Sequence, residues 1–145
     1  MRRHPIARAV RVDKLQVVAL EAALVAHATG DREALPVWRM LREPVATVRR
    51  RARRLAELLP GAAVVASQAS VGGGSLPGSA IASAAVEVRS ASPDGLATRL
   101  RVGRPSVVAR TDDGRILLDL RTVADDEVDD LARAVRRALA GSGDG

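Results

Sequence analysis

Residues 107–120, with the sequence VVARTDDGRILLDL, decide the fold class of this chain. Two apolar runs, Val107 to Arg110 and Ile116 to Leu120, flank the triplet Asp112-Asp113-Gly114. Because Asp-Gly tolerates the positive φ angles of a tight turn, the stretch predicts a β-hairpin. A final helix is expected from about Asp125 to Ala140, since its first turn is acidic and arginines lie near its end, which complements the helix dipole.

Two further strands and a helix are expected before the hairpin. Ala62 to Ser67 is a short apolar run, and Ile81 to Val88 alternates small apolar side chains with other residues. Between them lies a glycine-rich loop, Gly72 to Gly78, which either binds an anion through backbone N–H groups or allows close backbone packing. Pro93 to Val102 has the spacing of a helix.

The first part of the chain predicts helices only. One runs from Asp13, a good N-cap, to about Thr29, and its interior is apolar nearly all round, which indicates a buried helix. Residues 37–41 predict one or two further turns. From Val45 to Leu59 an apolar stripe faces a run of arginines, which predicts an amphipathic helix with the arginines in solvent.

These elements predict an α+β fold, with N-terminal helices followed by a small, mostly antiparallel sheet that has helices on one face. We expect a helical segment over residues 1–60 and a small α+β domain over residues 61–145. Phe and Tyr are absent and Trp38 is the only aromatic residue, so the core must consist of Leu, Val, Ile and Ala. Such a thin core favours docking against a partner surface.

The composition excludes several classes of protein. Without cysteine the chain has no disulfide framework, thiolate nucleophile or cysteine-based zinc site, and two distant histidines, His4 and His27, do not make a metal site alone. No apolar run reaches the roughly 18 residues of a membrane-spanning helix, and charges interrupt any signal peptide. A cytoplasmic protein that binds no metal and no membrane is therefore expected.

Basic residues form two candidate anion sites in this chain of formal charge +6, which has 22 arginines and one lysine. Arg8 and Arg11, near the start of the first helix, would converge on one anion if that stretch were helical. From spacing alone, an ordinary basic leader is the favoured interpretation. Farther along, Arg49, Arg50, Arg53 and Arg54 are possible RNA contacts, but a solvated helix face is the favoured explanation for them.

No complete catalytic set is recognisable. Asp119 and Arg121 lie two apart and would share one strand face, where an ion pair is a better explanation than catalysis. Lys14 is the only lysine, and nothing near it in the sequence suggests the depressed pKa of a Schiff-base lysine. The residues alone predict an anion-tolerant α+β domain.

Four motifs in order resemble the C-terminal portion of bacterial L-seryl-tRNA(Sec) selenium transferase, also called selenocysteine synthase. They are Arg3-His4-Pro5-Ile6-Ala7-Arg8-Ala9-Val10-Arg11-Val12-Asp13-Lys14-Leu15, continuing through Ala19-Leu20-Glu21-Ala22; Pro36-Val37-Trp38-Arg39-Met40-Leu41; Gly73-Gly74-Ser75-Leu76-Pro77; and Asp113-Gly114-Arg115 leading into Leu117-Leu118-Asp119-Leu120-Arg121-Thr122. The four motifs lie in order across the whole chain, which makes the resemblance specific.

The resemblance implies a pyridoxal-phosphate enzyme of the aminotransferase-like fold that converts seryl-tRNA(Sec) to selenocysteinyl-tRNA(Sec), with selenophosphate as selenium donor. It implies that Arg8 and Arg11 line the active site and face the donor anion, and that the protein forms homo-oligomeric rings around tRNA. The N-terminal helices would then lead from a large cofactor domain.

The family's chain is about three times longer, and its cofactor domain and Schiff-base lysine precede the segment seen here. Lys14 matches a different position, and the similarity is already present at Arg2-Arg3. We therefore expect a part of a longer protein that neither holds the cofactor covalently nor catalyses alone. Two alternatives remain open: a stand-alone basic RNA-binding module, and an oligomerisation or adaptor module.

Overall fold

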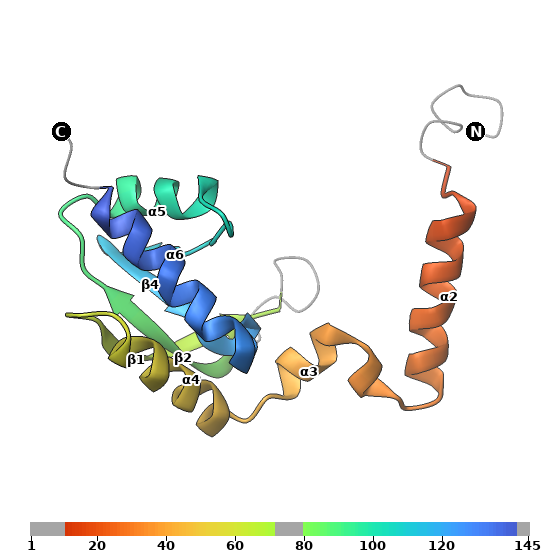
Figure 1. Ribbon diagram of the computed structural model, residues 1–145. Coiled ribbons are helices and arrows are strands. Elements are labelled where there is room, and N and C mark those ends of the chain that lie inside the picture. The colour runs from red at the N-terminus through yellow and green to blue at the C-terminus, as the bar shows by residue number, and fades with distance from the viewer. Residues whose placement is uncertain (1–10, 72–79, 142–145) are drawn as a thin grey trace. The chain divides into compact units, whose positions relative to one another are not determined.

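The computed structural model describes residues 11–71 and 80–141 (Figure 1). It clusters into two compact units, Met1–Arg42 and Glu43–Gly145. The first contains α2 (Lys14–Ala28), the 3₁₀ helix η1 (Arg32–Ala34) and α3 (Pro36–Arg42). The second contains α4 (Val45–Glu57), β1 (Ala63–Ser70), β2 (Ala80–Val88), α5 (Pro93–Val102), β3 (Arg110–Asp112), β4 (Arg115–Asp119), the 3₁₀ helices η2 (Leu120–Thr122) and η3 (Asp125–Glu127), and α6 (Val128–Ala140).

Helix α2 begins where the sequence predicts it. The Asp13 side chain accepts a hydrogen bond from the Gln16 backbone N–H (2.9 Å), and the Gln16 side chain accepts one from the Asp13 N–H (3.0 Å). This reciprocal capping box fixes the start of the helix. The prediction that α2 is buried is wrong, because none of its residues is buried. An apolar pattern shows which residues avoid water but does not supply the surface that covers them.

Ring stacking joins α2 to α3 within the first unit. The ring centroids of His27 and Trp38 lie 6.1 Å apart with an angle of 23° between the planes. The short helix predicted at residues 37–41 is therefore confirmed as α3, and the only aromatic side chain of the protein holds it beside the end of α2.

The second unit contains a four-stranded antiparallel sheet in the order β1-β2-β4-β3. The predicted hairpin is confirmed as β3 and β4, and its turn residues Asp113 and Gly114 have φ angles of 48° and 71°. Its first strand begins at Arg110 rather than Val107. Val107 and Ala109 instead pack at the margin of the core, and the Val107 N–H donates to the Leu100 carbonyl (2.9 Å).

Helices α4, α5 and α6 pack on one face of this sheet, so the predicted α+β fold is confirmed (Figure 1). The core joins alternate residues of β2 and β4 to one stripe from each helix. Its members include Val48, Ala52, Leu55, Val86, Leu96, Leu100, Ile116, Leu118, Val128 and Val135. As the composition requires, it is wholly aliphatic.

The first described unit ends at Arg42, and α4 packs on the sheet. The predicted boundary between a helical segment over residues 1–60 and an α+β domain over residues 61–145 stays a prediction. What the structure establishes is that α4 and the sheet share one hydrophobic core.

Candidate functional site

The two candidate anion-binding arginines precede α2. Arg8 lies outside the described residues, as does the Gly72–Gly78 loop. Arg11 is exposed and lies two residues before the N-cap Asp13. Because the first turn of a helix directs free N–H groups and a partial positive charge toward its start, this position suits an anion. Convergence of Arg8 and Arg11 on one anion stays a prediction.

Lys14, the only lysine of the sequence, is the first residue of α2, and its side chain is exposed. A Schiff-base lysine is activated by an apolar pocket or by a neighbouring cation. That this chain does not hold pyridoxal phosphate covalently stays a prediction.

Arg51 corrects the prediction that all the α4 arginines face solvent. Its side chain is only 10% exposed, and it donates to Glu43 Oε2 (Nη2, 2.9 Å) and to Asp125 Oδ1 (Nε, 3.0 Å). Burial alone would lower the pKa of the Arg51 guanidinium, but the hydrogen bonds to the two carboxylates outweigh burial and raise that pKa above its ordinary value. Arg51 therefore joins α4 to η3.

The four possible RNA contacts divide into two pairs. Arg54 donates to Asp129 Oδ2 (2.6 Å), and Arg50 lies 3.5 Å from Asp125 Oδ2. These acidic partners lie at the start of the last helical segment, so two of the four possible RNA contacts already form ion pairs within the protein. Arg49 and Arg53 are also exposed, and within the described residues neither makes an ion pair.

A wide hollow of about 630 Å³ lies beside Arg49. Strands β1 and β2 form part of its lining together with Arg110 and Arg115 of the hairpin. Arg110 also donates to Ser67 Oγ (3.1 Å), whereas Arg115 lies near Glu87 and Asp112. The hollow thus gathers three guanidinium groups from α4, β3 and β4.

Asp119 is the centre of a polar network on the sheet. Its carboxylate accepts hydrogen bonds from Ser67 Oγ (2.8 Å), Ser83 Oγ (2.6 Å) and the Arg121 backbone N–H (3.0 Å). The sequence pattern does not reveal either serine, because only the register that pairs Ser67 with Ser83 brings them together. These three hydrogen bonds satisfy the carboxylate in its partly buried position.

The predicted strand-face ion pair between Asp119 and Arg121 is wrong. Strand β4 ends at Asp119 and the chain turns into η2, so the two residues do not share a strand face. The guanidinium of Arg121 instead donates to the carbonyl oxygens of Glu43 (2.8 Å) and Ala82 (2.5 Å). With Arg121 only 5% exposed, these bonds hold the chain before α4 against β2.

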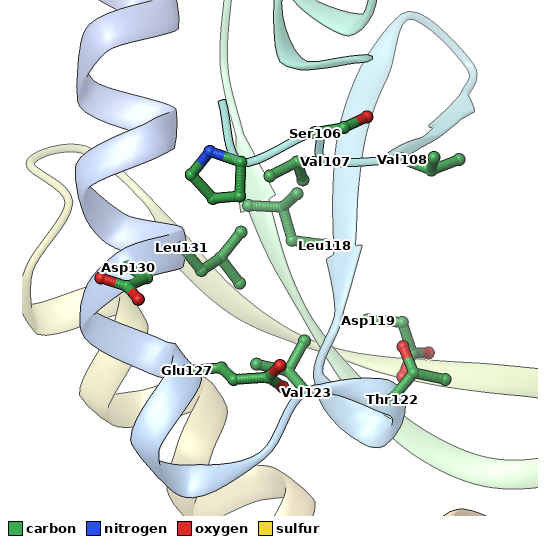
Figure 2. A pocket seen from close by; sticks show the side chains of 11 residues that line it. Ser106, Val107, Val108, Leu118, Asp119, Thr122, Val123, Glu127, Asp130 and Leu131 are labelled. Atoms are coloured by element: carbon green, nitrogen blue, oxygen red, sulfur yellow. The ribbon is translucent and has the colours of Figure 1, made fainter. Parts of the chain in front are cut away.

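An open cavity of about 380 Å³ lies between the chain before β3, the end of β4 and the start of α6 (Figure 2). Its lining includes the apolar residues Val107, Leu118 and Leu131 and the acidic residues Asp119, Glu127 and Asp130. Glu127 accepts a hydrogen bond from the Ala124 N–H (2.8 Å), and Asp130 pairs with Arg133, so these two carboxylates already have partners within the protein.

The described residues contain neither a metal-binding cluster nor a membrane-spanning helix. No group of three or more His, Asp or Glu side chains is placed to hold a metal ion there. Nor does any helix in that part of the chain combine the length and apolar character needed to cross a membrane.

Comparison with known proteins identifies relatives along nearly the whole chain. The family model described as L-seryl-tRNA selenium transferase matches residues 1–124. The L-seryl-tRNA(Sec) selenium transferase of Hyphomonas neptunium is 41% identical over 146 residues, which cover 94% of this chain and 32% of the relative. Proteins of the same name from Carboxydothermus hydrogenoformans and Moorella thermoacetica are 34% and 39% identical, covering 97% and 96% of this chain.

The fold and the exposed arginines define a basic α+β protein. The matches make the assignment specific: the chain belongs to the L-seryl-tRNA selenium transferase family. It spans about a third of the length of the curated relatives that it matches, 32% for each of the three named here.

Proposed function

We propose that this chain is the C-terminal part of an enzyme that converts seryl-tRNA(Sec) to selenocysteinyl-tRNA(Sec), with selenophosphate as the selenium donor. The observation that carries this proposal is the family match over residues 1–124, together with 41% identity to a relative of that name. The chain spans about a third of that relative, and in this proposal the remaining two thirds contribute the cofactor domain.

In this proposal, Arg8 and Arg11 bind the selenium-donor anion. Arg11 precedes a helix whose start is fixed by the capping box of Asp13 and Gln16. The positive end of the helix dipole and the planar guanidinium forks both favour a phosphate-like group at that place. The chain would thus position the donor, while the rest of the protein binds the reacting serine.

The cofactor belongs to the rest of the protein. The family resemblance implies pyridoxal phosphate, and Lys14 matches a different position from the lysine that would hold it. We expect the isolated chain to be inactive, and we expect the whole enzyme to be a cytoplasmic homo-oligomer that binds tRNA(Sec).

The test is a single polypeptide that joins this chain to the two thirds of the Hyphomonas neptunium relative that it does not match. We expect this chimera to convert seryl-tRNA(Sec) in the presence of selenophosphate and the isolated chain to show no turnover. Arg11→Gln in the chimera should raise the KM for selenophosphate at least tenfold and leave the affinity for seryl-tRNA unchanged. An inactive chimera beside an active intact relative would contradict the proposal, as would turnover by the isolated chain.

Within the same enzyme, Arg49 and Arg53 are the α4 residues proposed to contact the tRNA backbone. Both guanidinium groups are exposed, and Arg49 lies at the hollow that Arg110 and Arg115 also line. Phosphate groups bind such clusters without regard to base sequence, which suits a contact that orients a tRNA.

A further inference from the structure

Large apolar side chains are exposed along the whole of α2. Leu15 is 80% exposed, and Val17, Val18, Leu20, Leu24 and Val25 are each between 52% and 60% exposed. Scattered exposed hydrophobic residues are normal on a protein surface, but here six lie on one helix of 15 residues. Such a concentration indicates a helix that another polypeptide surface covers.

The exposed residues form two stripes rather than one. With about 100° of rotation per residue, Val17, Leu20 and Leu24 fall on one side of the helix. Leu15, Val18 and Val25 fall on another side, about 140° away. Two polar strips separate the stripes, one with Lys14 and Glu21 and the other with Gln16 and His27. Trp38 stacks on His27, so α3 packs at a polar strip and covers neither stripe.

The second unit has little apolar surface of its own that could cover α2. Among the described residues from 43 onward, only Val45, Val102 and Val108 are large hydrophobic residues with exposed side chains. They lie at the start of α4, at the end of α5 and before β3, and the large aliphatic side chains of this unit otherwise line its own core. The described residues of the second unit therefore offer little apolar surface for α2.

A second copy of this chain does not fit both stripes. A helix of 15 residues is about 22 Å long and about 10 Å wide, so one stripe presents only a few hundred Å². A stable interface needs about 800 Å² on each partner. Pairing of two copies through α2 would bury one stripe and leave the other in water, whereas a larger domain has room for walls on both sides.

We propose that both stripes of α2 dock into the part of the family's protein that this chain does not contain, as a helix held between two apolar walls. This inference rests on the proposed function, because it takes the two thirds of the relatives outside the match as the occupant. It identifies α2 as the principal attachment of this chain to the remainder of the enzyme.

The test mixes the full chain with the unmatched two thirds of the Hyphomonas neptunium relative as a separate polypeptide, and measures their association by sedimentation. We expect a complex, weakened at least tenfold by Leu20→Gln with Leu24→Gln, and weakened as much by Leu15→Gln with Val18→Gln. Gln forms helices about as well as Leu, and these side chains are exposed, so the variants should keep their helix content. Glu21→Gln, on a polar strip of the same helix, is the matched control and should bind as the unchanged chain does.

Three results would overturn the inference. One is association that neither pair of variants weakens, and another is no complex at all. The third is a dimer of this chain that either pair disrupts while the relative's polypeptide is not bound. Failure of docking remains separate from failure of the proposed function, because the chimera joins the two parts covalently and its turnover does not depend on association between separate chains.

Discussion

The guanidinium of Arg51 donates from Nε to Oδ1 of Asp125 at 3.0 Å, and the same side chain reaches Glu43 at 2.9 Å. One cation in the middle of α4 thus holds the chain before that helix and the turn before α6. These ion pairs join α4 to the segments before it and before α6, so their loss should lower the stability of the second unit.

Asp125→Asn should reduce the dependence of stability on acid pH. The hydrogen bond from Arg51 lowers the pKa of the Asp125 carboxyl in the folded protein. A carboxyl with a lowered folded pKa stabilises the protein above its unfolded pKa of about 3.9, and that stabilisation is lost as pH falls through the folded value. Because Asp125 is 56% exposed, we expect less than about 1 kcal/mol at neutral pH.

Urea unfolding measured between neutral pH and the acid range checks this expectation. The difference in unfolding free energy between the unchanged chain and Asp125→Asn should shrink below about pH 4. Asp126→Asn, one residue along, is the control, since Asp126 is exposed and within the described residues makes no ion pair. A difference that stays constant with pH would contradict the assignment.

Leu55→Ala and Leu24→Ala should differ sharply in their effect on stability. Leu55 is fully buried in the core, so its truncation should cost about 2–5 kcal/mol of unfolding free energy. Leu24 is 59% exposed on α2, so the same truncation should change stability by less than about 0.5 kcal/mol. Denaturation followed by far-ultraviolet circular dichroism compares the two. Equal costs would show that α2 is buried in the isolated chain.

Gly114→Ala should destabilise the hairpin through the backbone alone. Gly114 has a φ of 71°, and a Cβ there would meet no atom within 4 Å, so the cost of about 1–2 kcal/mol comes from the left-handed conformation. Gly114→Asn should cost clearly less, because Asn adopts that region more readily. Thermal unfolding of the two variants measures the contrast, and equal losses would point to a contact rather than to the backbone.

Neutralising Arg49 and Arg53 should weaken tRNA binding and its salt dependence together. If both contact phosphates, the double substitution to Gln should reduce the slope of log affinity against log salt by about two. The same change of charge at Arg101 and Arg133, on α5 and α6, is the control. Binding titrations with tRNA(Sec) over a range of salt concentrations give the slopes. An unchanged slope would assign these arginines to a solvated helix face.

Local signals in the sequence are sufficient for most of the secondary structure. Asp13 with Gln16 marks the start of α2, and Asp113-Gly114 marks the hairpin turn, because caps and turns are made by residues that lie next to each other in the chain. The family motifs are local in the same sense, so the order of residues along the chain suffices to indicate the protein family.

The candidate site is less predictable, since its contacts join residues far apart in sequence. The Arg51 side chain is held by a hydrogen bond to Asp125, 74 residues away in the sequence. The hydrogen bonds to Asp119 come from serines of β1 and β2. A run of arginines has the same appearance in sequence whether its members face water or carboxylates. Only packing between α4 and the last helical segment distinguishes Arg51 and Arg54 from Arg49 and Arg53.

By itself, the sequence determined the family, most of the helices and strands, and the aliphatic nature of the core. These follow from residue type and short-range spacing, which set helix caps, turns and apolar stripes. Only the tertiary structure decided which charges are paired, how the strands are ordered, and that the apolar helix α2 is uncovered in this chain. Whether a helix is buried depends on the surfaces that pack against it, and the apolar pattern of α2 contains no information about those surfaces.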